Sequence, residues 1–173
     1  CTNLSSLGNM AAVTIIEDHA FYNCASLTNI SSLSHSETIG QYAFSGDVVL
    51  AAVPEMASLT SIGNYAFSGC SLLASIGAAS NLTSVGGHAF ENCASLSDAS
   101  GISSVESIGA YAFSQDVLLS AIPSMPSLAS IGDYAFSGCK ALTSFISAAS
   151  LESIGKYSFS GCVGLGTVSL PSN

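Results

Sequence analysis

Thiols and carboxylates recur at one fixed interval in this chain, and such groups could bind a metal, form disulfides or accept hydrogen bonds. Zinc is not expected, because the sequence contains no C-x-x-C pair. Both residue types can accept a hydrogen bond from a backbone N–H at a turn. The eight positions, each 23 residues after the last, are Cys1, Cys24, Asp47, Cys70, Cys93, Asp116, Cys139 and Cys162. A structural role at a turn is therefore favoured over metal binding.

Aromatic rings with a polar edge recur at the same interval and form a candidate interaction ridge. Tyrosine buries its ring and keeps a polar tip, which suits interfaces. The alternative is a structural ladder that shields the neighbouring turn. Two of these positions, 19 and 88, hold histidine. They are three repeats apart, too far to share a metal, so each histidine is expected to substitute for tyrosine. The candidate ridge consists of His19, Tyr42, Tyr65, His88, Tyr111, Tyr134 and Tyr157.

Other candidate sites are few. Three Asn-x-Ser/Thr triplets match the acceptor pattern for N-glycosylation, at Asn3, Asn29 and Asn81. No serine lies in a G-x-S-x-G elbow, and no acidic loop has the spacing of a calcium site. We therefore expect no catalytic residues, no cofactor and no metal, and the protein is not expected to be an enzyme.

The elements that carry these residues must repeat too. The stretch I-G-x-Y-A-F-S-G-C begins at Ile62, and a version of it opens every 23-residue repeat. A fixed period in this range indicates a solenoid, in which each coil buries its apolar face against its neighbours. We predict a β-rich solenoid of about seven and a half 23-residue coils, with little regular helix, as a single domain over residues 1–173. Coils 1 to 7 begin at Ile16, Ile39, Ile62, Val85, Ile108, Ile131 and Ile154.

Each coil should contain two short extended segments, because apolar columns recur with Ser, Thr and β-branched residues between them. Ser36 is the exception in one apolar column. A tight helical or 3₁₀ turn is expected between the glycine and the cysteine. The glycine should let the chain leave the strand sharply, and Pro54, Pro123 and Pro171 should end strands. The phenylalanines expected to be buried and stacked are Phe21, Phe44, Phe67, Phe90, Phe113, Phe136 and Phe159.

These motifs resemble the BspA-like, or Treponema pallidum-type, leucine-rich repeats. That family repeats L-x-x-I-x-I-P-x-x-V-x-x-I-G-x-x-A-F-x-x-C, and the resemblance covers essentially the whole chain. The I-x-I-P segment departs from the pattern, since only residues 168–171 keep it and the proline comes two places early at Pro54 and Pro123. The resemblance implies a secreted or surface-exposed protein that binds host or matrix proteins, without enzyme activity.

A longer period of three coils is superimposed on the first. The column of thiols and carboxylates repeats as C-C-D, and His19-Ala20-Phe21 recurs as His88-Ala89-Phe90. Stacked coils lie about 4.7–4.9 Å apart, and disulfides tolerate Cα separations of about 4.4–6.8 Å. Neighbours such as Cys70 and Cys93 could therefore bridge. We expect mostly free, buried thiols, and the pairing stays open.

Composition limits the partners. Lys and Arg total 2 and the formal net charge is −9, so neither nucleic acid nor an anionic membrane surface is an expected partner. No apolar run is long enough for membrane insertion. The surface of the first extended segment carries small, nearly uncharged residues and lacks the Trp, Tyr and Arg anchors of binding hot spots.

Two function classes remain open. The first is an extracellular or cell-surface array that mediates adhesion through protein or glycan partners. The second is a structural module of an extracellular filament, sheath or wall, in which copies of the chain pack against each other. The chain begins and ends part-way through a repeat, which suggests a fragment of a longer array. The resemblance favours the first class, and the low-charge surface and unbroken period favour the second.

Overall fold

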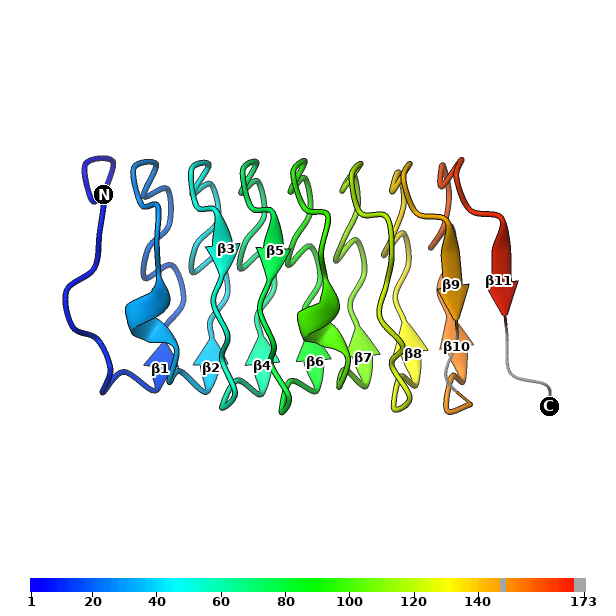
Figure 1. Cartoon of the computed structure of the whole chain (residues 1–173), viewed down its shortest axis with the longest axis horizontal. Helices are drawn as coiled ribbons and strands as arrows, with labels where there is room; N and C mark the ends of the chain where they lie inside the picture. Colours follow the sequence, from blue (N-terminus) through cyan, green and yellow to red (C-terminus); the bar gives the residue numbers. More distant parts are fainter. Residues whose placement is uncertain (147–148, 170–173) are drawn as a thin grey trace.

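The structure is a computed structural model that describes residues 1–146 and 149–169. The chain winds into one row of stacked coils, with coil 1 near one end and coil 7 near the other (Figure 1). The described part of the chain contains short strands and two 3₁₀ helices, and no α-helix. The predicted β-rich solenoid with little regular helix is confirmed.

One parallel sheet runs along the whole row and contains seven two-residue strands in the order β1-β2-β4-β6-β7-β8-β10. Each strand pairs with the same positions of the next coil, so that Ile39 lies opposite Ile62 and Ser61 opposite Ser84. Every sequence column therefore becomes a line along the solenoid. The strands are β1 (Ile15–Ile16), β2 (Thr38–Ile39), β4 (Ser61–Ile62), β6 (Ser84–Val85), β7 (Ser107–Ile108), β8 (Ser130–Ile131) and β10 (Ser153–Ile154).

The first extended segment of each coil, which follows the thiol and carboxylate column, is less regular than the segment that forms the long sheet. It forms two separate pairs, β3 (Ala52–Val53) with β5 (Ser75–Ile76), and β9 (Ser144–Ile146) with β11 (Thr167–Ser169). Figure 1 shows these strands in a second row, pointing opposite to the strands of the long sheet. The two extended segments per coil are confirmed for these coils.

In coils 1 and 4 the first extended segment leads into a 3₁₀ helix, η1 (Ser31–Leu33) or η2 (Ser100–Ile102). A side-chain oxygen two residues earlier accepts the first N–H of each helix. Asn29 Oδ1 accepts from Ser31 at 2.6 Å, and Asp98 Oδ1 accepts from Ser100 at 2.8 Å. The period of three coils found in the sequence is therefore also a period in local conformation.

The prolines behave differently from one another. Pro54 follows directly after β3, as predicted. The prediction is wrong for Pro123, because residues 120–125 of coil 5 form no strand for it to end. Pro123 and Pro126 both lack an N–H and so interrupt the ladder there. Pro171 lies outside the described residues.

Stacked phenylalanine rings form the centre of the core, with neighbouring centroids 5.2–5.5 Å apart and nearly parallel planes. The prediction of burial is wrong for Phe21 and Phe159, which are only partly buried, because each lies at an end of the column. The five inner rings are fully buried: Phe44, Phe67, Phe90, Phe113 and Phe136.

Serine takes one place in the apolar column that Leu59 and Leu82 occupy in coils 2 and 3. Ser36 is fully buried like those leucines. Its hydroxyl donates a hydrogen bond to the Val13 carbonyl, 3.1 Å away. The exception is tolerated because the buried hydroxyl has a partner.

The segment from the glycine to the cysteine is a series of tight turns. In coil 3 the amides of Ala66, Ser68 and Cys70 each donate to the carbonyl three residues earlier. Tyr65 and Gly69 have φ angles of 58° and 75°, and the same two positions are left-handed in every coil. The predicted tight turn is confirmed, but the predicted helical form is wrong, because a left-handed residue at every fourth position prevents a right-handed helix.

The glycine column has a reason that the sequence did not reveal. A Cβ added to Gly63 would lie 2.7 Å from the backbone nitrogen of Gln41, and one on Gly109 would collide with the backbone nitrogen of Gly87. The strands end directly before the glycine, at Ile62 and Ile108, where the sequence predicted the exit. Neither glycine has a positive φ. Glycine is needed because adjacent backbones approach too closely for a side chain.

Candidate functional site

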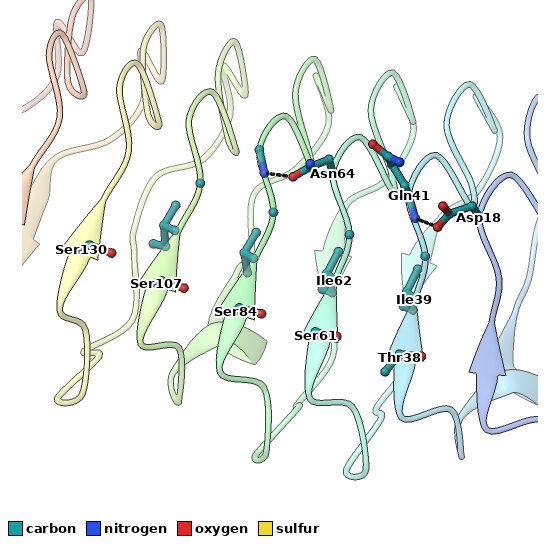
Figure 2. Close-up of a pocket in the computed structure, with 17 residues that line it drawn as sticks. Asp18, Thr38, Ile39, Gln41, Ser61, Ile62, Asn64, Ser84, Ser107 and Ser130 are labelled. Carbon is teal, nitrogen blue, oxygen red and sulfur yellow. Dashed lines mark hydrogen bonds between the residues drawn. The ribbon is translucent and has the colours of Figure 1, made fainter.

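A long shallow groove lies over the seven-stranded sheet. It has a volume of about 720 Å³ and extends across the strands β2, β4, β6, β7 and β8. Figure 2 shows the side chains that line it, with the outward residue of each strand forming a row. That row consists of Thr38, Ser61, Ser84, Ser107 and Ser130. The groove is therefore a ladder of hydroxyl groups at the spacing of the coils.

The strand geometry explains why hydroxyls face the groove. Successive side chains of a strand point to opposite faces, and Ile62 and Ile108 point into the core with only 2 % exposed. The preceding serine must then point outward. The next residue is the glycine that cannot accept a Cβ, so backbone forms the floor of the groove beside the hydroxyls.

Polar side chains two positions after the isoleucine form one rim. Asp18 Oδ1 accepts a hydrogen bond from the backbone N–H of Gln41 at 2.6 Å, and Asn64 Oδ1 accepts one from the backbone N–H of Gly87 at 2.7 Å (Figure 2). Three coils after Asn64, and beyond the groove lining, Asp133 Oδ1 accepts the backbone N–H of Lys156 at 2.6 Å in the same way. These bonds fix the rim side chains in place, and the rim is acidic or neutral.

The groove suits recognition by hydrogen bonds. Its lining offers hydroxyl, amide and carboxylate groups and contains no histidine, lysine or cysteine. A serine nucleophile needs an adjacent base within hydrogen-bond reach, and no residue of the lining supplies one except the carboxylate of Asp18, which already accepts a backbone amide.

The predicted aromatic ridge is a continuous stack of rings directly beside this groove, since each ridge residue follows a rim residue in the sequence. Neighbouring centroids lie 4.3–5.0 Å apart, closest between Tyr65 and His88. Stacking covers the faces of the inner rings and leaves their edges for contact. The two end rings, His19 and Tyr157, are exposed, the tyrosine at 63 %, and the rings between them are partly buried.

Charge along the ridge is low. His88 Nδ1 lies at hydrogen-bond distance, 2.9 Å, from Glu91 Oε2, the one contact between a histidine and a carboxylate in the described residues. Burial, with smaller contributions from Tyr42 and Glu91, raises the pKa of the Tyr65 hydroxyl. The ridge therefore presents neutral hydroxyl edges, which favour hydrogen bonding over stacking against a sugar face.

The column of thiols and carboxylates lies inside the solenoid, away from both surfaces. Thiols in this column donate to phenylalanine carbonyls 26 residues earlier, as from Cys70 to Phe44 at 3.2 Å. Burial is the main reason that the pKa of the Cys70 and Cys139 thiols is raised. Among the described residues, no three His, Cys, Asp or Glu side chains lie together as a metal site would need.

The three candidate glycosylation sites, Asn3, Asn29 and Asn81, are all exposed. Asn29 lines a smaller hollow of about 260 Å³ with Thr28, Ala51 and Pro54, next to the first extended segments. None of the three asparagines lines the large groove.

The groove was not predicted from the sequence, although its hydroxyl column was visible there. The serine before the isoleucine is one of the Ser, Thr and β-branched residues that predict an extended segment, and that pattern does not reveal a groove. Column spacing shows which residues line up, and the shape of the surface depends on how far each coil extends on either side. The rim bonds of Asp18, Asn64 and Asp133 likewise need the coordinates.

A model of the BspA type leucine rich repeat region matches residues 1–120 and 118–173, with six copies. A comparison with curated proteins found no match. Within residues 1–146 and 149–169 there is no helix that could span a bilayer.

Three solved structures are similar. A leucine-rich repeat protein from Bacteroides ovatus is 24 % identical with a TM-score of 0.48, covering 96 % of this chain and 54 % of its own. A leucine-rich repeat protein from T. pallidum is 26 % identical with a TM-score of 0.48, covering 96 % and 57 %. A leucine-rich cell surface protein from Faecalibacterium prausnitzii is 18 % identical with a TM-score of 0.42, covering 97 % and 73 %. The chain thus spans little more than half the length of the first two.

Proposed function

Because the chain belongs to the BspA-type leucine-rich repeat family along its whole length, we propose that it is a non-enzymatic interaction module, displayed at a cell surface or secreted. Residues 1–173 act as one solenoid domain in this proposal. Its function is adhesion to protein or glycan partners, and the groove over the seven-stranded sheet is the contact face.

The hydroxyl ladder is the observation that carries this proposal. Five hydroxyls on successive coils line a groove of about 720 Å³, and such a row can bind an extended partner through many weak, equally spaced hydrogen bonds. The aromatic ridge beside it adds hydroxyl edges. A few buried polar contacts give specificity while repetition along the solenoid gives affinity.

Charge narrows the partner class. The chain carries two lysines and no arginine, against a net charge of −9. Polyanions such as nucleic acid or sulfated chains are repelled. Uncharged glycans and neutral or basic polypeptide segments fit the groove and its rim, in which Asp18 is acidic and Gln41 and Asn64 are neutral.

The test is a binding screen against immobilised neutral glycans and extracellular-matrix proteins. The variant S84R/S107R fills the centre of the groove, and the same column accepts the larger Ile15 in β1 and Thr38 in β2. Ser97→Arg, on the exposed surface of the first extended segment, is the matched control. Binding that is lost in S84R/S107R and retained in the control supports the groove; equal binding by both variants excludes it.

A structural role in a filament, sheath or wall is the second candidate, favoured by an exposed apolar edge. Val48, Leu72, Leu118 and Val163 are 40 %, 55 %, 53 % and 83 % exposed, and they follow the thiol and carboxylate column in different coils. Lateral contact between copies would cover them. Electron microscopy of the purified protein tests this, since fibres or sheets that disappear in L72S/L118S would favour the structural role.

A further inference from the structure

Two carboxyl groups are sealed in the solenoid core. Asp47 and Asp116 have no exposed surface. In each, Oδ1 accepts a backbone amide from the preceding coil, from Cys24 at 2.6 Å and from Cys93 at 2.8 Å. Among the described residues, Oδ2 of each aspartate has no hydrogen-bond partner. A buried polar atom without a partner is unfavourable for folding, and an unpaired buried charge more so.

The surroundings of Asp47 contain almost no compensating charge. Its column neighbours are the thiols of Cys24 and Cys70. Burial raises the pKa of the Cys70 thiol, so that this thiol stays protonated. The amino group of Cys1 is the one positive charge that acts on it, and only as a minor influence.

Asp116 is in a less favourable position for ionisation. Its column neighbours are the thiols of Cys93 and Cys139, and the negative charge of Glu91 also acts on it. No described ion pair includes either aspartate.

The cysteines of the same column show that a side chain at these positions acts as a hydrogen-bond donor. The thiols of Cys93 and Cys139 donate to the carbonyls of Phe67 and Phe113, 26 residues earlier, at 3.2 and 3.1 Å. At the same offset, the equivalent acceptors for the two aspartates are the carbonyls of Phe21 and Phe90. An ionised carboxylate has no proton to donate, whereas a neutral carboxylic acid has one O–H donor.

We propose that Asp47 and Asp116 are proton-binding sites, each a neutral carboxylic acid in the folded solenoid that donates from Oδ2 to the Phe21 or Phe90 carbonyl. Folding then takes up protons at two places three coils apart. The solenoid is more stable in mildly acidic than in mildly alkaline surroundings, and it loosens first around coils 2 and 5 when these groups ionise.

The pKa values of both aspartates are shifted upward, as expected for carboxylic acids that stay protonated when folded. Burial raises the pKa of Asp47 from 3.8 to about 7, against the opposing effects of the Cys24 amide and the Cys1 amino group. Burial also raises the pKa of Asp116 well above 3.8, opposed by the Cys93 amide and assisted by Glu91.

The direction in which stability changes with pH follows from the linkage between proton binding and folding. A raised pKa in the folded state gives stability that is complete below the unfolded pKa of 3.8 and is lost as pH rises to about 7. Over those three pH units, Asp47 alone changes the unfolding equilibrium about a thousandfold.

The experiment compares urea unfolding at about pH 5 and about pH 8 for the wild type, for D47N/D116N and for the control E55Q/E152Q. Both variants replace two carboxyl groups with amides, but Glu55 and Glu152 are exposed. Wild type and control should lose stability at the higher pH, and D47N/D116N should lose most of this dependence because an amide is neutral throughout. An equal pH dependence in all three proteins would overturn the proposal.

A second measurement does not rely on a variant that folds. Ordinary carboxyl groups are ionised near pH 6, so the infrared spectrum of the wild-type protein at that pH should retain the carbonyl band of two protonated carboxyl groups. A folded wild-type protein without this band would overturn the proposal. The variant D47C/D116C, which continues the thiol column, should fold and lack the band.

Discussion

At the residue scale, burial decides whether a reactive group can react. Cys24, Cys70, Cys93 and Cys139 lie in the core, while Cys1 is exposed and Cys162 is intermediate. The thiolate is the reactive form of cysteine, and burial raises the pKa of Cys162 and, more strongly, of Cys93. These thiols act as hydrogen-bond donors inside the solenoid.

We therefore predict that alkylation of the native protein at neutral pH modifies Cys1 quickly, Cys162 slowly and the four core thiols only after unfolding. Mass spectrometry of peptides, before and after denaturation, measures this order. Rapid native labelling of Cys70 would contradict the buried column, and core thiols blocked even after denaturation would show disulfides instead.

The phenylalanine stack allows a matched pair of core substitutions. Phe90→Ala should lower the free energy of unfolding by about 3–5 kcal/mol, because it removes a fully buried ring between two others. Phe159→Ala should lower it less, since that ring is only partly buried. Urea unfolding monitored by circular dichroism gives both values, and equal losses would contradict a core centred on the inner rings.

At the element scale, contact between coils is closest at the glycine column and the turn that follows. The two left-handed residues in each turn are a tyrosine or histidine and then a glycine, asparagine or glutamine. Left-handed conformation is unfavourable for tyrosine, yet the ring stacks hold it in every coil. The turn is therefore kept by contacts between coils, and less by local preference.

Gly63→Ala should destabilise the solenoid by about 1–3 kcal/mol, because its Cβ would meet the backbone of coil 2. Gly8→Ala is the matched control, since a Cβ there has nothing within 4 Å. Thermal unfolding of both variants measures the difference. A Gly63→Ala variant as stable as the control would show that the coils can separate slightly without loss.

The sequence predicted the columns well because, with a strict period of 23 residues, positions 23 apart occupy equivalent places in successive coils. The coil starts and the stacking of the phenylalanines are correct for this reason, and the rings of the ridge stack in the same way, while a role of the ridge in binding stays a prediction. Backbone conformation at Tyr65 could not be predicted, because tyrosine does not favour a positive φ. The groove could not be predicted either, since Ser84 and Ser107 are ordinary strand residues until the neighbouring coils define a surface.

At the scale of the whole molecule, stability is a sum over coils and the contacts between neighbours. The parallel register continues from β1 to β10 without a break. Coil 4 has several coils on each side, whereas coils 1 and 7 have few on one side. Opening should therefore begin at the two ends of this chain and move inward.

Hydrogen exchange followed by mass spectrometry should show this gradient. Amides of the inner turns, such as those of Phe67 and Phe90, should exchange slowest, and those of coil 7 fastest, because local opening needs fewer contacts broken there. Equal protection in every coil would instead indicate one cooperative unit of unfolding.

Because every coil pairs with its neighbour in the same register, the gene can change in length by whole repeats. Unequal crossing-over between similar repeats removes or adds whole coils, and each new junction joins the same columns as before. Events that involve three coils also preserve the order of thiols and carboxyl groups, with Asp47 and Asp116 at equivalent places. A lineage can in this way lengthen or shorten the groove in steps of one coil without designing a new fold.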